Sequence, residues 1–510
     1  MLFNSVIFIT IFLPLALVGW FLLQKLENPI PAKAFMVGMS LWFYGYYNIH
    51  YLWILLISLG FNYLLSDLFE RLGGIGQHLP GECAVVQAEK TQGGQDSLRI
   101  RKALLYIGIL GNLGLLFYFK YFNFFIDNCN FFLHTDIQIE RIALPLGISF
   151  FTFQQLSFVI ERYRNTAPHY NVWDYAFFVS FFPQLVAGPI VLHSELLPQL
   201  QERKNRKFSG ESFYEGFSLF VLGFAKKVLL ADSLAVLVQA EYANIPMLDS
   251  PASWAVICWY MMELYFDFSG YCDMARGIGK MFGFQLPENF DSPFRATSVR
   301  EFWRRWHKTL SRFLTQYVYI PLGGNRKGKY RQALNLLIVF LVSGIWHGAN
   351  WTFIVWGLMH GVAAVIEVLF PKLRFPWEWL NRLCTAVFVT LSFSIFRSDS
   401  LEQAALLWQK LFAGGNTGMF LGVCNVLNYP ENYALMKVLD LTGSGLLNAL
   451  YVSTFAILTI VSILLIRGPK AEQWLEKRGK SNLGILCLAT LFTWSFLSLS
   501  QVSVFLYFNF

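Results

Sequence analysis

His347 is the residue whose position most directly suggests chemistry, because it lies inside the apolar segment 334–361. An ionisable side chain at membrane depth costs free energy and is a functional-site hypothesis by default. Loss of water favours the neutral imidazole, which is the form that a general base requires. Gly344 and Gly348 lie on either side of it and permit close approach of backbone or ligand. The alternative is a buried histidine satisfied by a neighbouring carbonyl or placed near a water-filled vestibule.

A second histidine, His307, lies in the most basic part of the chain. Between Arg295 and Arg331 there are ten Lys or Arg residues and one acid, Glu301. At about 100° per residue, the aromatic and leucine side chains of 302–317 fall on one face of a helix and the basic ones on the opposite face. This pattern predicts an interfacial helix with its aromatic side in the acyl region and His307 at the edge of the apolar arc. The helix is either a membrane anchor or a basic surface that attracts an anionic substrate while His307 points into a cavity.

The glycine-rich segment 322–329 adds three positive charges. Its freed backbone N–H groups could bind phosphate, but an ordinary cytoplasmic turn explains the same residues and is the favoured interpretation. His360 is a weaker candidate than His347, because Met359 and Gly361 beside it indicate helix packing. The candidate donor-binding residues are Trp303, Arg304, Arg305, Asn325 and Lys327.

Three acids, Glu263, Asp267 and Asp273, also lie in an apolar context. Proton-coupled transporters place acids in this way. Arg276, however, follows Asp273 at helical contact spacing, and the aromatic surroundings suit a structural hydrogen-bond network. The structural role is the favoured interpretation.

The elements that hold these residues are predicted to be membrane helices. Of the 510 residues, 55% are hydrophobic and 14% are charged, and the mean hydropathy is +0.45, whereas a soluble domain has about 25% charged residues. A span needs about 20 mostly apolar residues, and the chain has roughly ten to thirteen such segments. Several are short or broken by Gly and Pro, which a membrane tolerates only where protein or a cavity covers the backbone. The segments lie near 5–23, 34–65 (one long or two short), 103–126, 142–160, 172–192, 213–238, 252–286, 333–346, 351–370, 383–396, 446–466 and 483–509.

The expected organisation is a single all-α polytopic membrane domain over 1–510, with its core at 100–370. The stretch 71–98 is rich in Gly and Gln and is predicted to be a flexible loop. The net charge of +8 collects between apolar segments, so a membrane surface explains it more simply than nucleic acid does. The positive-inside pattern places 201–207 and 467–480 in the cytoplasm and the N-terminus outside.

The seven cysteines are scattered along the chain. They form no Cys-x-x-Cys pair and no His/Cys cluster at metal spacing. Neither a disulfide framework nor a metal site is therefore expected.

Several motifs together resemble those of the membrane-bound O-acyltransferase superfamily. The likeness is closest to its bacterial branch of alginate O-acetyltransferase membrane subunits, with the related D-alanyl-transfer and peptidoglycan O-acetylation proteins. Cys272 stands where that branch often has Ser. The motifs are WRRWH (303–307), LGGNRKG (322–328), SGIWHG (343–348), LYFDFSGYCDMA (264–275), ENFDSPF (288–294) and the terminal FLYFNF (505–510).

The resemblance implies a ring of tilted helices, with re-entrant or interfacial helices, around a thinned centre that a cytoplasmic funnel reaches. It carries over His347 as catalytic and His307 as a second important residue. It also implies acetyl-CoA or an acyl carrier thioester as the donor substrate, with no bound cofactor. The bacterial cytoplasmic (inner) membrane and an extracytoplasmic acetyltransferase partner follow from the branch.

The hypothesis is therefore acetyl transfer across the membrane to a hydroxyl, for O-acetylation of an extracytoplasmic polysaccharide such as an alginate-like exopolysaccharide or peptidoglycan. His347 would act as general base, and His307 would orient a reactant or stabilise charge. The sequence shows no Ser-His-Asp arrangement, which favours direct transfer without a covalent intermediate. The alternatives are a polytopic transporter and a non-catalytic scaffold of a cell-envelope export complex.

Overall fold

The computed structural model describes residues 1–72, 92–202 and 207–415, and then 424, 426–427, 429–438, 440, 444–501 and 506. Within these ranges every regular element is helical, which confirms the all-α prediction. The chain forms two compact units, one of Met1–Phe217 with Ala275–Pro287 and the other of Ser218–Met274 with Glu288–Phe510. Most of the predicted 71–98 loop, and nearly all of the 505–510 motif, lie outside the described residues. The single membrane domain stays a prediction.

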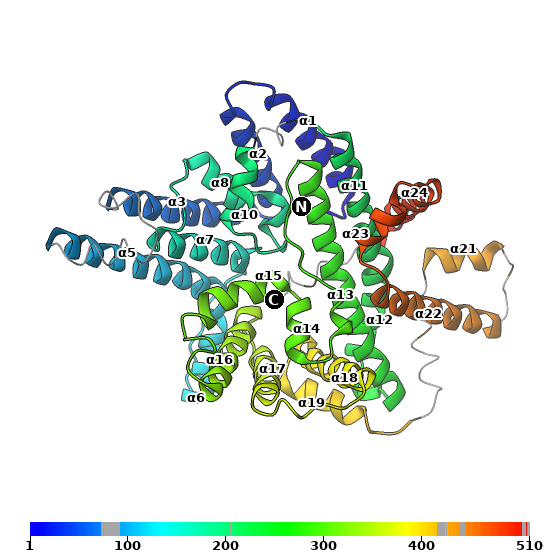
Figure 1. Cartoon of the computed structure of the whole chain (residues 1–510). Coiled ribbons are helices and arrows are strands. Elements are labelled where there is room, and N and C mark those ends of the chain that lie inside the picture. Colours follow the sequence, from blue (N-terminus) through cyan, green and yellow to red (C-terminus); the bar gives the residue numbers. More distant parts are fainter. Residues whose placement is uncertain are drawn as a thin grey trace. The chain divides into compact units, whose positions relative to one another are not determined.

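The first unit consists of helices joined by turns and loops (Figure 1). The predicted span at 34–65 is two helices and not one, because the chain turns between Gly45 and Ile49. The elements are η1 (Phe8–Phe12), α1 (Leu13–Leu23), α2 (Ile30–Gly45), α3 (Ile49–Leu72), α5 (Gln92–Leu116), η2 (Phe117–Tyr121), α6 (Phe122–Leu133), α7 (Ile148–Tyr163), α8 (Val172–Ser180), α9 (Phe182–Leu185), α10 (His193–Gln201) and the start of α11 (Gly210–Ala225).

Buried polar side chains connect the helices of this unit. The Asn62 side chain on α3 donates to the side-chain oxygens of Asn112 on α5 (3.0 Å) and Gln155 on α7 (2.8 Å). Lys33 on α2 forms a buried ion pair with Asp174 on α8. Between apolar helices in lipid, such contacts supply the specificity that the hydrophobic effect cannot.

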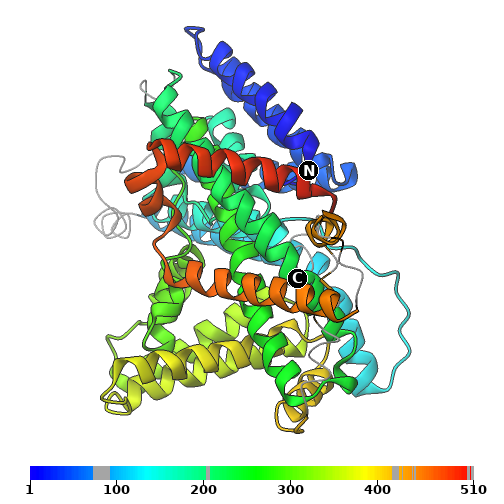
Figure 2. The same cartoon turned by 90° about the vertical axis from the view of Figure 1, so that its right-hand side faces the viewer.

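The second unit carries the candidate histidines. Figure 2 shows its yellow-green helices α16, α17 and α18 running side by side. Its elements are the end of α11, η4 (Lys226–Ala231), α12 (Asp232–Tyr242), η5 (Ile245–Met247), most of α13 (Ser250–Met281), η6 (Pro293–Arg295), α14 (Val299–Arg305), α15 (Lys308–Leu314), η7 (Thr315–Tyr319), α16 (Lys329–His347), α17 (Trp351–Leu369), α18 (Glu378–Arg397), α19 (Leu401–Lys410), α21 (Pro430–Val438), α22 (Ser444–Arg467), α23 (Ala471–Trp474), η8 (Leu475–Gly479), α24 (Asn482–Leu497) and η9 (Ser498–Gln501).

Among the described residues, five helices are long and apolar enough to cross a membrane, against the ten to thirteen spans expected. They are Ile49–Leu72, Asp96–Leu133, Trp351–Leu369, Glu378–Arg397 and Gly445–Arg467. Phe8–Leu23 and Asn482–Leu497 are shorter apolar helices. The sequence count is higher because apolar stretches such as 172–192 are divided: α8 ends at Ser180 and a separate turn of helix, α9, follows. The protein is a multi-pass membrane protein, and several of its apolar segments are too short to span alone.

Two of the three acids singled out in the sequence, Asp267 and Asp273, are held by lysines from the π-helical turn η4. Lys227 Nζ lies 2.6 Å from Asp267 and 2.6 Å from Asp232, and Lys226 lies 2.6 Å from Asp273. These ion pairs agree with the structural role that the sequence favoured. Charges buried in apolar surroundings are retained only when they are paired in this way.

Glycines bring α16 and α17 into backbone contact. A Cβ placed on Gly357 would lie 2.6 Å from the Phe340 carbonyl oxygen and 3.1 Å from the Gly344 Cα. On α17, Gly357 and Gly361 form a G-x-x-x-G pattern, and both face α16. This is the small-residue interface that lets two membrane helices approach closely.

We expect Gly357→Ala to destabilise the protein by about 1–3 kcal/mol, because the added methyl group meets backbone that cannot move aside. Thermal unfolding in detergent, followed by size-exclusion chromatography, measures the change. The matched control is Gly60→Ala on α3, where the added Cβ meets nothing within 4 Å. Equal melting temperatures for the two variants would contradict the close packing of α16 and α17.

Candidate active site

His347 is the last residue of α16. The chain leaves the helix at the next residue, Gly348, where φ is −166° and the backbone becomes extended. A Cβ on Gly348 would lie 2.1 Å from the Phe353 ring, and one on Gly344 would lie 2.4 Å from the Phe353 carbonyl oxygen. The two glycines therefore allow close packing against α17: Gly348 packs against the Phe353 ring, and Gly344 packs against the Phe353 backbone.

The imidazole of His347 is enclosed by aromatic rings. Its side chain is 4% exposed. The ring centroids of Trp346, Trp356 and Phe396 lie 4.9, 5.0 and 5.3 Å from its own, each in an edge-to-face arrangement. The imidazole is therefore largely shielded from solvent.

The continuous interfacial helix predicted for 302–317 is wrong. α14 ends at Arg305, His307 adopts a left-handed backbone conformation (φ 45°), and α15 begins at Lys308. Residues with a Cβ rarely adopt this conformation, so it interrupts the helix. The aromatic arc also does not face lipid: its residues are buried in protein, namely Phe302, Trp303, Trp306, Leu310, Phe313 and Leu314.

Asn289 fixes the turn at His307. Its side-chain oxygen lies 3.1 Å from His307 Nδ1 and accepts from the Thr309 N–H (3.2 Å) and hydroxyl (2.9 Å). Its backbone oxygen accepts from the Lys308 N–H at 3.0 Å, and its Nδ2 donates to Cys272 Sγ at 3.4 Å. Contacts with a residue from outside α14 and α15 thus replace the helical hydrogen bonds that the break removes.

The two candidate histidines belong to one aromatic cluster. The Trp346 ring contacts both of them: its centroid lies 6.1 Å from that of His307 and 4.9 Å from that of His347. His307 is fully buried and packs edge-to-face on Phe268 at 4.8 Å. The structure therefore brings His307 and His347 together around Trp346.

His360 has a structural role. The indole N–H of Trp303 donates to its Nδ1 at 3.1 Å, so its Nε2 carries the hydrogen and donates to the Ser392 hydroxyl at 2.9 Å. Ser392 in turn donates to the Val389 carbonyl at 2.7 Å. This chain joins α14, α17 and α18, and it accounts for both ring nitrogens. Trp303, predicted to bind the donor, is itself buried as part of the chain.

The other predicted donor-binding residues are spread over the surface of this unit. Arg304 is exposed, whereas Arg305 is held 2.9 Å from Glu301. Asn325 and Lys327 are exposed on the turn before α16. The three glycines of this turn have positive φ values, 104°, 57° and 85° at Gly323, Gly324 and Gly328, so the turn alone explains them.

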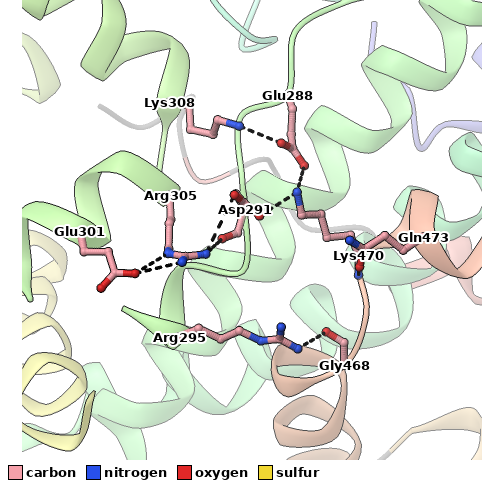
Figure 3. Close-up of polar contacts among 9 residues, drawn as sticks. All are labelled: Glu288, Asp291, Arg295, Glu301, Arg305, Lys308, Gly468, Lys470 and Gln473. Atoms are coloured by element: carbon pink, nitrogen blue, oxygen red, sulfur yellow. Dashed lines mark hydrogen bonds and ion pairs between the residues drawn. The ribbon is translucent and has the colours of Figure 1, made fainter. Parts of the chain in front are cut away.

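A network of charged side chains surrounds the segment that carries Asn289 (Figure 3). Lys308 lies 2.8 Å from Glu288. Lys470, in the connection before α23, lies 2.9 Å from Glu288 and 2.7 Å from Asp291. In the same view, Arg295 donates to the Gly468 carbonyl at 3.3 Å. The connection at 468–470 therefore holds the 288–291 segment against α15.

These contacts change the acidity of the network. The hydrogen bond from Lys470 holds the pKa of Asp291 below its usual value. Burial opposes ionisation of Glu288, but hydrogen bonds from Lys308 and Lys470 outweigh it and lower the pKa of Glu288. Despite partial burial, the two carboxylates raise the pKa of Lys470. All three groups are therefore charged at neutral pH.

Comparison with known families decides the assignment. Residues 114–398 match the model of the MBOAT, membrane-bound O-acyltransferase family, and this range contains both candidate histidines. The chain belongs to the membrane-bound O-acyltransferase family.

This acyltransferase is similar along its whole length to a peptidoglycan O-acetyltransferase of Helicobacter pylori, with 35% identity over 100% of this chain and 98% of that protein. It is 35% identical to the probable alginate O-acetylase AlgI of Pseudomonas aeruginosa over 81% of this chain and 75% of that one. A teichoic acid D-alanyltransferase of Streptococcus thermophilus is 30% identical over 44% of this chain and 56% of its own. The acyltransferase thus lies in the bacterial, alginate O-acetylase-like branch.

Sequence reasoning missed two residues of this site, Asn289 and Lys470. Asn289 lies in the ENFDSPF motif, which was noted without a role for any single residue. Lys470 was counted only as part of a basic cytoplasmic connection. A helical period describes neighbours along one helix, so it carries no signal for a residue 18 positions upstream or for a lysine in a distant connection.

We expect Lys470→Met to lower the melting temperature at pH 7, because Glu288 and Asp291 lose a charged partner. Acids with a lowered folded pKa stabilise the protein above their unfolded pKa of about 4 and lose that contribution as the pH falls. The difference from wild type should therefore be constant from about pH 6 to 8 and should shrink as the pH falls below about 4, through the lowered pKa values of the two acids. Lys477→Met, at an exposed lysine on η8, is the control. A difference that persists undiminished at pH 3 would exclude the ion pairs as its cause.

Proposed function

We propose that this acyltransferase transfers an acetyl group from a thioester on the cytoplasmic side of the bacterial inner membrane to a hydroxyl on the outer side. Acetyl-CoA is the proposed donor. The N-terminus is proposed to lie outside, as the distribution of basic connections favours. The observation that supports this proposal most is His347, a buried imidazole at the end of α16 within the family-matched range.

The proposed acceptor is a glycan of the cell envelope, with peptidoglycan as the first to test. The similarity to the peptidoglycan O-acetyltransferase spans nearly all of both chains, whereas that to the alginate O-acetylase spans about four fifths of this one. The names of these relatives also favour a polysaccharide-modification system, in which an extracytoplasmic partner completes the transfer.

In the proposed reaction, His347 acts as general base. The acceptor oxygen attacks the thioester carbonyl carbon while its proton passes to the imidazole, and the carbonyl electron pair moves to oxygen. Collapse of the tetrahedral adduct breaks the C–S bond, and the thiolate takes the proton back from the imidazole. The aromatic enclosure of His347 favours this chemistry because it keeps out water, which would otherwise hydrolyse the donor.

The two alternative functions fare differently. The transporter was suggested by intramembrane acids, and the lysine partners of Asp267 and Asp273 give those acids a structural explanation. The scaffold predicts that His347 can be replaced without loss of product acetylation, so the same experiment tests it.

We expect His347→Ala and His347→Gln to lower acetyl transfer to peptidoglycan by about 10²–10⁴-fold, the usual contribution of a general base. Transfer of labelled acetyl groups in membrane vesicles containing the partner measures the change. His50→Gln, at an exposed histidine near the start of α3, is the matched control. Wild-type turnover in both His347 variants, at normal protein levels, would refute the proposal and favour the scaffold.

A further inference from the structure

We propose that Asn289 is a positioning residue that holds His307 as the Nδ1–H tautomer, so that the Nε2 of His307 works as a neutral hydrogen-bond acceptor. The consequence is that His307 orients a substrate O–H or N–H group and does not stabilise the oxyanion. The catalytic part of this inference rests on the proposed function. The tautomer itself does not.

The first step identifies the Asn289 atom that faces His307. A backbone N–H can only donate, so the Asn289 atom 3.2 Å from the Thr309 N–H must be the side-chain oxygen. The donation from Nδ2 to Cys272 Sγ agrees with this orientation of the amide. The same oxygen lies 3.1 Å from His307 Nδ1. Nδ1 therefore carries the hydrogen and donates it.

The second step concerns the other ring nitrogen. A neutral imidazole that carries its hydrogen on Nδ1 has a lone pair on Nε2. In that form Nε2 can accept a hydrogen bond but cannot donate one to a developing negative charge. Only the imidazolium could do so, and full burial of His307 disfavours the charged form.

Several charged side chains lie on the elements that form the turn at His307. Titratable groups on these elements include Asp267, Cys272 and Asp273 on α13, Glu288 and Asp291 on the 288–291 segment, Glu301 and Arg305 on α14, and Lys308 and Arg312 on α15. Glu288 and Lys308 are paired with each other at 2.8 Å. Beyond Trp346 lies His347 on α16. The Asn289 side chain that contacts the imidazole is neutral, so this contact selects a tautomer without selecting a charge.

The fourth step shows that the arrangement is rigid. His307 has a left-handed backbone conformation, which costs free energy and persists only where the surrounding contacts enforce it. The Asn289 carbonyl accepts from the Lys308 N–H (3.0 Å), and the Asp291 N–H donates to the Arg305 carbonyl (2.8 Å). Lys470 then binds both Glu288 and Asp291, on either side of Asn289 (Figure 3). Asn289 is thus held from both directions, and the imidazole is held with it.

The direct test is ¹⁵N NMR of the full-length protein labelled at histidine. The His307 signals are assigned by their loss in His307→Gln. We expect a protonated Nδ1 and an unprotonated Nε2 in wild type at neutral pH. A protonated Nε2, in either the other tautomer or the imidazolium, would overturn the proposal. This measurement needs no activity, so it decides the tautomer even if peptidoglycan proves not to be the acceptor.

The second test uses Asn289→Asp, which keeps the accepting oxygen but adds a negative charge beside the imidazole. A negative charge beside an imidazole stabilises the imidazolium and raises the pKa of the imidazole by about 1–3 units. We therefore expect the acid limb of the kcat/KM profile to move to higher pH, with activity recovering as the pH rises. Asn28→Asp is the matched control, because Asn28 is also an asparagine whose side-chain oxygen accepts from a backbone N–H (3.0 Å, from Ile30) but is exposed.

A merely structural role for Asn289 predicts lower activity at all pH values with an unchanged profile. That result, or a wild-type profile with wild-type turnover, would overturn the role assigned to His307. If His347→Gln retains full activity while the NMR spectrum shows the expected tautomer, the proposed function fails and the positioning by Asn289 stands.

Discussion

The cost of burying an imidazole away from water is the constraint on which the centre of the second unit depends. A buried polar group without a partner costs about 1–3 kcal/mol, and a buried charge costs more. At His360 the cost is met by a complete chain from Trp303 through Ser392 to the Val389 carbonyl. At His307 it is met on one side by Asn289. The hydrogen bonds therefore distinguish His360 from the other two histidines. The ring of His360 cannot take a substrate proton without breaking a chain of hydrogen bonds that joins three helices.

The partner of His307 comes from a segment that has no regular structure over 288–292. Such a segment cannot satisfy its own backbone groups and must bind those of its neighbours. Its backbone forms hydrogen bonds with the backbone of Arg305 and Lys308. Its two acids form ion pairs with Lys308 and Lys470. The connection before α23 is in this way coupled to the turn that holds His307, although it is far away in sequence. Polar networks of this kind are energetically cooperative, so loss of one member weakens the rest.

Most of the helices, and the burial of His347, could be predicted from the sequence because hydropathy and helical period are local properties. The break at His307 could not. The period of 302–317 persists through α14 and α15, and the left-handed residue is stabilised by Asn289 from outside the helix. The aromatic arc was predicted to lie in lipid, but an apolar surface is equally satisfied by protein, and periodicity does not distinguish the two. Apolar composition likewise does not show where a helix such as α8 ends.

The same contacts change the electrostatic interpretation of the basic segment. The ten positive charges between Arg295 and Arg331 suggested a strongly attractive surface for an anionic donor. Arg305 and Lys308, however, are neutralised by Glu301 and Glu288, and Arg295 is bonded to backbone carbonyls at 467–468. Exposed ion pairs and screened charges attract weakly, so the fully exposed positive charges that remain are Arg304 and those of the run at 326–331. Attraction of the proposed anionic donor would therefore come from those exposed residues and not from the basic face of a single amphipathic helix.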